Sequence, residues 1–230
     1  MSFKRLKLFL LLLVLFLTAD VCAYFFIPDV SALKTVTPKI SAFMQQRLDE
    51  AELKGRPLSI KRKYVPLSRI SPYLRKAVLI AEDDKFWHHE GFDFDAIERA
   101  FERNLEEKRF AFGASTITQQ LARNLYLTPS KNPLRKAKEA ILTFRMENQL
   151  SKKRILELYL NFAEWGKGIF GAEAAARYYF KKSASRLRPM EAARLAAILP
   201  NPRYYNPAGK SRYVRIKARR IYRIMQRRGF

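Results

Sequence analysis

The chain has 230 residues, of which 48% are hydrophobic, so it is long enough for one domain with a real core and an appended segment. Its 45 Lys and Arg against 21 Asp and Glu give a formal net charge of +24, which predicts attraction to a polyanion such as nucleic acid, anionic lipid or a phosphorylated substrate. The single cysteine, Cys22, excludes an internal disulfide.

The first 27 residues are predicted to anchor the chain in a membrane. A basic stub precedes an apolar run from Leu8 to about Ile27, and about 20 such residues suffice to span a bilayer as a helix. Because a basic flank stays cytoplasmic, the rest of the chain is expected outside the cytoplasm, where nucleic acid is out of reach. A cleaved signal peptide is the alternative, since Ala19 and Ala23 are small. The length of the apolar run favours an uncleaved signal anchor.

Residues 28–65 are predicted to be a membrane-proximal linker, in which 41–54 are compatible with a short helix. From 66 to 207 successive helical patterns are separated by Pro and Gly, without strand-like alternation, which predicts a mainly α domain. Ser71-Pro72 is a predicted helix start, because serine caps free N–H groups and proline suits the first turn. Asn132-Pro133 is expected to start a later helix in the same way.

The helix that begins at Pro72 is expected to end in a catalytic constellation. Residues 82–91, EDDKFWHHEG, combine adjacent carboxylates, aromatic rings and a histidine pair directly after an apolar run. A carboxylate at the end of a buried helix is partly removed from water, which raises its pKa and suits it to proton transfer. Glu82 is therefore a candidate general base. The alternative is that Glu82 only closes the helix and that His88 and His89 lie on the surface.

A second helix is predicted to begin at Asp95, because Asp95 and Glu98 have the spacing of a capping box. Its periodicity gives one apolar face and leaves Arg99 free to point elsewhere. The apolar face comprises Ile97, Ala100, Phe101 and Leu105.

A third helix is expected from about Thr116, within the segment 113–124. Its apolar positions form a stripe that would be buried, whereas Thr116, Gln120 and Arg123 share another face. Hydroxyl, amide and guanidinium groups suit sugar hydroxyls and a phosphate. An ordinary solvated helix face is the alternative. The stripe consists of Ile117, Leu121 and Leu125.

The last segment, 208–230, is predicted to be a basic amphipathic helix. Ten Lys and Arg and no acidic residue fall between 201 and 230, and apolar residues recur at helical spacing from Val214 to Met225. Packing on the domain, lying on anionic lipid and binding a partner protein all fit this pattern. The basic and aromatic stretch 106–112 fits either a membrane-facing lobe or a plain loop.

Several strings follow one another in a distinctive order: EDxxFxxHxG at 82–91, GASTITQQLARNLYL at 113–127, RKxxE at 135–139, SKKRILELYLN at 151–161, GAEAAARYYF at 171–180 and LAAILPNP at 195–202. In this order they resemble the peptidoglycan glycosyltransferases, glycosyltransferase family 51. No transpeptidase domain follows within the 230 residues, so the chain looks like the monofunctional biosynthetic form.

The resemblance implies a lysozyme-like helical domain that polymerises lipid II, the undecaprenyl-pyrophosphate-linked precursor of the bacterial cell wall, on the outer face of the cytoplasmic membrane. Glu82 would act as general base on the 4-hydroxyl of the acceptor sugar, which attacks the anomeric carbon of the donor. The α-linked undecaprenyl pyrophosphate leaves and a β-1,4 bond forms with inversion. Glu139 would be the second essential carboxylate, near the departing pyrophosphate, and would work with cations such as Arg135, Lys136 or a divalent metal. From its own segment alone, Glu139 could instead balance the helix dipole or pair with Arg135 four residues earlier.

The resemblance also assigns substrate-binding roles to Asp83, His89, Arg99, Ser115, Thr116, Gln119, Gln120, Arg123, Arg135 and Lys136. Arg123 stands where the family usually has lysine, which keeps the charge but changes its geometry. Phe86 is expected to pack rather than to contact substrate. No organic cofactor is implied, and a divalent metal, Mg²⁺ or Mn²⁺, at the pyrophosphate is left open. The expected partners are lipid II, the growing glycan strand and proteins of cell wall synthesis or division.

Two other functions compete with this interpretation. A peptidoglycan-cleaving muramidase or lytic transglycosylase would share the lysozyme-like fold and a catalytic glutamate, but not the GASTITQQ string or the RKxxE glutamate. A non-enzymatic cationic binder would explain the charge of +24 without explaining the ordered motifs.

Overall fold

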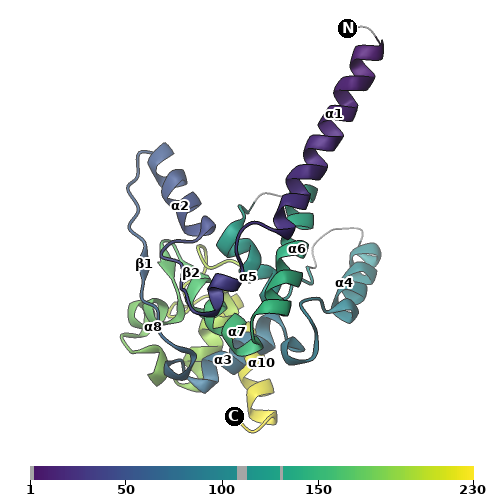
Figure 1. Cartoon of the computed structure of the whole chain (residues 1–230). Coiled ribbons are helices and arrows are strands. Elements are labelled where there is room, and N and C mark those ends of the chain that lie inside the picture. The colour runs from purple at the N-terminus through teal and green to yellow at the C-terminus, as the bar shows by residue number, and fades with distance from the viewer. Residues whose placement is uncertain (1–2, 108–112, 130–131) are drawn as a thin grey trace.

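A computed structural model describes residues 3–107, 113–129 and 132–230 (Figure 1). The described part is mainly helical, as predicted. Its helices are α1 (Phe3–Cys22), α2 (Ala42–Leu53), α3 (Pro72–Glu82), α4 (Phe94–Glu106), α5 (Ile117–Tyr126), α6 (Pro133–Gln149), α7 (Lys152–Phe162), α8 (Ala172–Phe180), α9 (Pro189–Ile198) and α10 (Arg212–Arg227). The strands are β1 (Lys61–Arg62), β2 (Glu164–Gly166) and β3 (Ile169–Phe170), and β3 pairs in parallel with β1 and antiparallel with β2.

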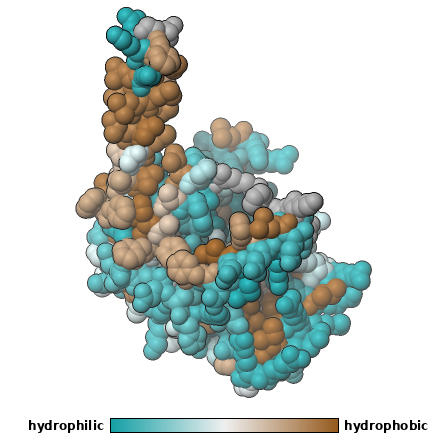
Figure 2. All heavy atoms as spheres, turned by 90° about the vertical axis from the view of Figure 1, so that its right-hand side faces the viewer, coloured by the Kyte–Doolittle hydropathy of each residue, from teal (hydrophilic) through white to brown (hydrophobic). Residues whose placement is uncertain are grey.

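The helix α1 projects from the body as an apolar column (Figure 2). The stretch Phe3–Phe25 is long and apolar enough to cross a membrane, and none of it is buried in the protein. Its inner end is fixed to α6, because Asp20 pairs with Lys138 at 2.5 Å and Arg145 donates to the carbonyl of Tyr24 at 2.8 Å. The predicted membrane anchor is thus a continuous helix that begins before Leu8.

The core positions α3, whose last residue is Glu82. Four alanines of α9 are completely buried, and their small side chains let α3 and α10 approach that helix closely. On the other side, α5 packs between α6 and α7. The buried α9 alanines are Ala192, Ala193, Ala196 and Ala197.

The C-terminal helix is part of this core. Its apolar positions are buried against α9 and α3, which supports packing among the three interpretations of the basic segment. Because α9 and α3 cover the apolar face of α10, that face is not available to lipid. The buried positions are Val214, Ala218, Ile221 and Met225.

The helix starts agree with the sequence in part. The cap of α6 is as predicted, since Asn132 accepts from the N–H of Leu134 at 2.9 Å. The helix α3 begins at Pro72, but the Ser71 hydroxyl does not cap it and donates to the Leu187 carbonyl at 3.0 Å instead. The prediction for α4 was two residues late, because Asp93 is the cap.

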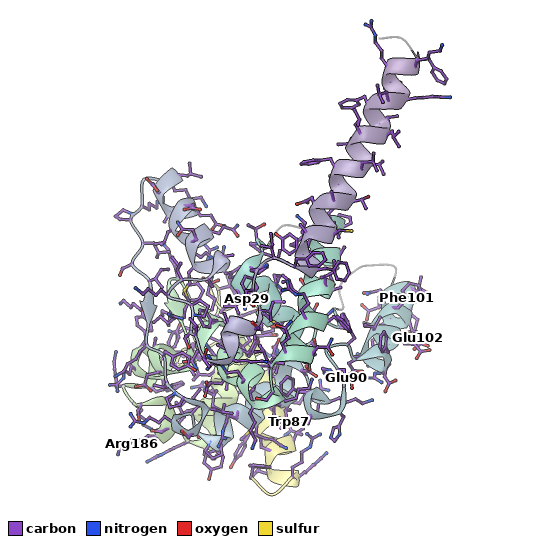
Figure 3. All side chains as sticks on the ribbon, in the orientation of Figure 1. Asp29, Trp87, Glu90, Phe101, Glu102 and Arg186 are labelled. Carbon is purple, nitrogen blue, oxygen red and sulfur yellow. The ribbon has the colours of Figure 1, made fainter. Side chains whose placement is uncertain are left out.

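The helix α4 stands apart from the body (Figure 1). It has no buried residue, and its predicted apolar face is exposed, as for Phe101 at the outer edge of Figure 3. An exposed apolar stripe on one helix is unusual for a surface that faces only water. The predicted lobe or loop at 106–112 lies largely outside the described residues.

Candidate active site

Two cavities meet at the hydrogen bond between Glu82 and Gln120. The first, of about 500 Å³, is lined by Glu82, Arg99 and Ser115 among others, and lies between the end of α3 and α4. The second, of about 350 Å³, is lined by Gln120, Arg123 and residues of the loop after α9. The Gln120 amide donates to Glu82 Oε2 at 3.0 Å, so this pair links the cavities.

Glu82 has the environment of a proton acceptor. Burial at the end of α3 raises the pKa of its carboxyl above the ordinary value, and the neighbouring Asp83 adds to the rise. The Gln120 hydrogen bond and the charges of Lys217 and Arg123 oppose this shift without cancelling it. The carboxylate oxygen Oε1 has no hydrogen-bond partner among the residues that the structure describes, which leaves it open to a substrate hydroxyl.

The orientation of Gln120 is set by Tyr159 from α7. The Tyr159 hydroxyl donates to Gln120 Oε1 at 2.9 Å, so the amide must present its NH₂ group to Glu82. Tyr159 is completely buried, which raises its pKa well above 10 and keeps it a donor. We call this chain of hydrogen bonds from Tyr159 through Gln120 to Glu82 the Tyr159–Gln120 relay. It was not predicted, because Tyr159 lies far from Glu82 in sequence.

Replacing Tyr159 by phenylalanine is expected to lower kcat about 2–10-fold, the equivalent of one hydrogen bond, because the Gln120 amide is then free to turn. The buried ring is retained, so the thermal midpoint should change little. Steady-state kinetics and a melting curve test this. An unchanged kcat would show that Tyr159 does not orient the amide.

Asp83 and His89, predicted to bind substrate, also hold the site together in this structure, and Asp83 lines the cavity of about 500 Å³. Asp83 accepts from His89 Nε2 at 2.9 Å and from the N–H of Ile117 at 2.9 Å, so both of its carboxylate oxygens are engaged. The N–H of Gly91 donates to His89 Nδ1 at 3.1 Å, which places the histidine proton on Nε2. The pair fixes the end of α3 against the start of α5, which favours a positioning role.

Thr116 and Gln119, also predicted to bind substrate, help to fix the start of α5. They form a capping box at the start of α5, in which the Gln119 side chain accepts from the N–H of Thr116 at 2.9 Å. The Thr116 hydroxyl also donates to the Gly91 carbonyl at 2.7 Å. Both side chains are buried, and they hold α5 so that Gln120 reaches Glu82. Phe86 is completely buried, and it packs as expected.

Glu139 is enclosed by cations. Its carboxylate is completely buried. It pairs with Arg135 and with Lys136, the latter at 2.5 Å, and both cations lie on α6 within four residues of Glu139. Arg123 approaches Glu139 Oε2 at 3.9 Å from α5. The Lys136 ammonium also donates to the Ser115 hydroxyl at 3.3 Å, so Ser115 joins this cluster. Three cations around one carboxylate leave a positive charge of two.

The comparisons with known proteins agree with this geometry. The profile of the family described as Transglycosylase matches residues 50–226. A biosynthetic peptidoglycan transglycosylase of Aromatoleum aromaticum is 51% identical over 189 residues, covering 80% of this chain and 82% of the relative. One of Herminiimonas arsenicoxydans is 41% identical over 229 residues, covering 100% of this chain and 98% of the relative.

The chain belongs to the transglycosylase family. Membership confirms the resemblance found in the motifs and makes the chain an enzyme of glycosyl transfer with a lysozyme-like helical domain. The family match runs past residue 207 and includes nearly all of α10. This agrees with the burial of the apolar face of α10 in the same core.

In this transglycosylase, α10 also supplies a cation near the candidate base. Lys217 is partly buried, which lowers the pKa of its ammonium, while the charge of Glu82 opposes that shift. In return, Lys217 stabilises the ionised form of Glu82. The basic pattern of 208–230 gave no signal that would separate Lys217 from its exposed neighbours.

Replacing Lys217 by methionine is expected to raise the pKa of Glu82 further, because a charge that favours its carboxylate is removed. Glu82 must be ionised to accept a proton, so the acid limb of the kcat/KM profile should move to higher pH. The matched control is Arg219→Met, which removes an exposed cation from the same helix and should leave the limb in place. An unmoved limb in the Lys217 variant would contradict this coupling.

The donor set does not fit a metal held by protein side chains alone. No group of three or more His, Cys, Asp and Glu side chains within 3–107, 113–129 and 132–230 is arranged to hold one. Both oxygens of Glu139 already face cations, and those of Asp83 are engaged. Arg135 and Lys136 place positive charge beside Glu139, where the sequence also allowed a divalent metal at the pyrophosphate. A divalent ion brought by the pyrophosphate remains a prediction.

Proposed function

We propose that this transglycosylase is a monofunctional peptidoglycan glycosyltransferase that polymerises lipid II into β-1,4-linked glycan strands. The observation that carries the proposal is the contrast between its two carboxylates. Glu82 is held with a raised pKa and a free oxygen at the junction of two cavities, whereas Glu139 is held inside a cationic cluster. One is suited to accept a proton and the other to organise charge around a leaving group.

Glu82 takes the proton of the acceptor 4-hydroxyl as that oxygen attacks the anomeric carbon of the donor chain. The carbon–oxygen bond to the pyrophosphate breaks, and its electron pair leaves with undecaprenyl pyrophosphate. Attack opposite an α-linked leaving group gives a β bond, so a single displacement inverts the centre. The Tyr159–Gln120 relay holds the Glu82 carboxylate still during transfer.

The cluster of Arg123, Arg135 and Lys136 binds the departing pyrophosphate. Its surplus of positive charge lies in a partly dry site, where fixed cations stabilise developing negative charge more strongly than water does. Glu139 keeps the three cations from repelling one another before substrate arrives. Arg123 offers two parallel N–H groups to phosphate oxygens, which fits a planar fork where lysine is usual.

A single-pass protein with its basic N-terminal stub in the cytoplasm places this domain on the outer face of the cytoplasmic membrane. The exposed apolar face of α4 would then lie against the bilayer, beside the cavity that it borders. Substrate and enzyme share that surface, and basic side chains draw a lipid-linked pyrophosphate toward the cleft.

Incubation of the full chain in detergent micelles with labelled lipid II tests the proposal. Glycan strands of increasing length are expected on a gel, and preformed glycan should stay intact. Fragments released from preformed glycan, with no polymer from lipid II, would instead identify a cleaving muramidase or lytic transglycosylase.

A further inference from the structure

A groove lined by residues of α3, α7 and the C-terminal end lies apart from the active site. It measures about 750 Å³ and shares no lining residue with either cavity of the site. We call it the distal groove. It is lined by Pro66, Leu67, Ser68, Pro72, Arg75, Lys76, Leu79, Trp87, Lys153, Arg154, Leu156, Glu157 and Phe230.

The distal groove has an apolar floor and two exposed aromatic rings. Leu79 and Leu156 are buried beneath it, whereas Trp87 and Phe230 remain 46% and 44% exposed. An aromatic side chain that stays half exposed beside an apolar floor lacks part of the favourable free energy of burial, which is about 25 cal/mol per Å² of apolar surface. Such a surface is typical of binding sites for other molecules.

The charge of the groove is positive. Glu157, its one acid, accepts from Arg154 at 2.5 Å, so these two charges offset each other. That leaves Arg75, Lys76 and Lys153 as cations at the groove. Lys76 lies 4.8 Å from the centre of the Phe230 ring, which keeps an ammonium beside an aromatic face.

Arg75 has an unmet hydrogen bond. Its Nε is buried and has no partner among the residues that the structure describes. A buried donor without an acceptor costs about 1–3 kcal/mol, and a carboxylate that pairs with the part of the Arg75 guanidinium that lines the groove would offset some of this cost. The groove is therefore suited to a ligand that carries an anion next to apolar groups.

The position of the groove separates it from the membrane. Trp87 lies at the end of the body opposite to α1, and the C-terminal end of the chain, which carries Phe230, is at the same end (Figures 1 and 3). Lipid head groups around α1 are therefore out of reach of this surface.

We propose that the distal groove binds an acidic peptide segment of a partner protein on the same side of the membrane as the domain. A carboxylate of the segment pairs with Arg75, and an aromatic or large aliphatic side chain inserts between Trp87 and Phe230. Lys76 and Lys153 attract further acidic residues, which gives the interaction a salt dependence.

A library of displayed random peptides tests this on the full chain in detergent micelles. Peptides retained by wild type are counter-selected with an Arg75→Glu/Lys153→Glu variant. The control, Lys181→Glu/Arg186→Glu, makes the same change in net charge on an exposed basic surface elsewhere. Enriched peptides should join Asp or Glu to an aromatic or aliphatic residue, and the groove variant should weaken their binding about tenfold or more.

A Phe230→Ala variant checks the apolar half of the site and should weaken the same peptides, while glycosyl transfer stays at the wild-type level and reports an intact fold. Three results would overturn the proposal: no peptide that separates wild type from the groove variant, enriched peptides without acidic residues, or equal losses in the control. Displacement of the peptides by anionic vesicles at equal affinity would assign the groove to lipid and overturn it as well.

Discussion

Glu82→Gln is expected to lower the rate of lipid II polymerisation about 10²–10⁴-fold, the usual contribution of a general base. Glutamine keeps the shape and the hydrogen bond with Gln120 but cannot take the acceptor proton. KM should change less than kcat, because the loss falls on the chemical step. The matched control is Glu90→Gln, an exposed carboxylate eight positions further on, which should retain full activity.

The same substitution makes a prediction for stability. The pKa of Glu82 is raised in the folded protein, so the folded state binds a proton more readily than the unfolded chain does. Its stabilising contribution is therefore present below the unfolded pKa and is lost as pH rises through the folded value. Above the folded pKa the ionised, buried carboxylate opposes folding. Glu82→Gln should thus have a thermal midpoint equal to or above that of wild type, and a large fall would show that lost activity reflects lost fold.

Glu139→Gln is expected to have the second large effect on activity. It removes the anion that holds three cations together, so the pyrophosphate-binding geometry should loosen and kcat fall about 100-fold. The cost in stability should be about 2–3 kcal/mol, below the 3–5 kcal/mol typical of buried pairs, because Lys136 and Arg123 are partly exposed to solvent screening. Kinetics and chemical denaturation measure the two effects.

Glu147 provides the matched control for this variant. It lies on the same helix, is nearly as buried, and pairs with Lys152 at 2.8 Å outside both cavities of the site. Glu147→Gln should lower stability while leaving kcat close to wild type. If both variants lose activity in proportion to stability, the role of Glu139 in the site is structural only.

The local features of the fold could be predicted from the sequence because they depend on neighbouring residues. The start of α3 at Pro72, the cap of α6 at Asn132 and the buried stripe of α5 follow from side-chain chemistry and helical spacing. The strands were not predicted, because two or three residues are too few to show alternation. The apolar face of α4 was predicted, but periodicity cannot say whether another element covers it.

The roles of the site residues depended on contacts across the chain, which limits what a motif can tell. The motifs predict that Asp83 and His89 bind substrate, and the structure adds that they bond to each other and that Asp83 accepts from the N–H of Ile117. Tyr159 and Lys217 had no local signal, because each acts on the Glu82 environment from a helix distant in sequence. Glu139 stood out as a catalytic candidate through resemblance alone. Its pairing with Arg135 follows from their i, i+4 spacing, whereas the approach of Arg123 from α5 is seen only in the structure.

The stereochemistry of a single new glycosidic bond tests whether Glu82 drives an inverting transfer. Two differently labelled lipid II molecules are coupled by the full chain, and NMR of the product gives the configuration of the new linkage while undecaprenyl pyrophosphate is counted. We expect a β-1,4 linkage and one undecaprenyl pyrophosphate released per bond, both lost in Glu82→Gln. An α linkage, or polymer formed at the wild-type rate without Glu82, would contradict this expectation.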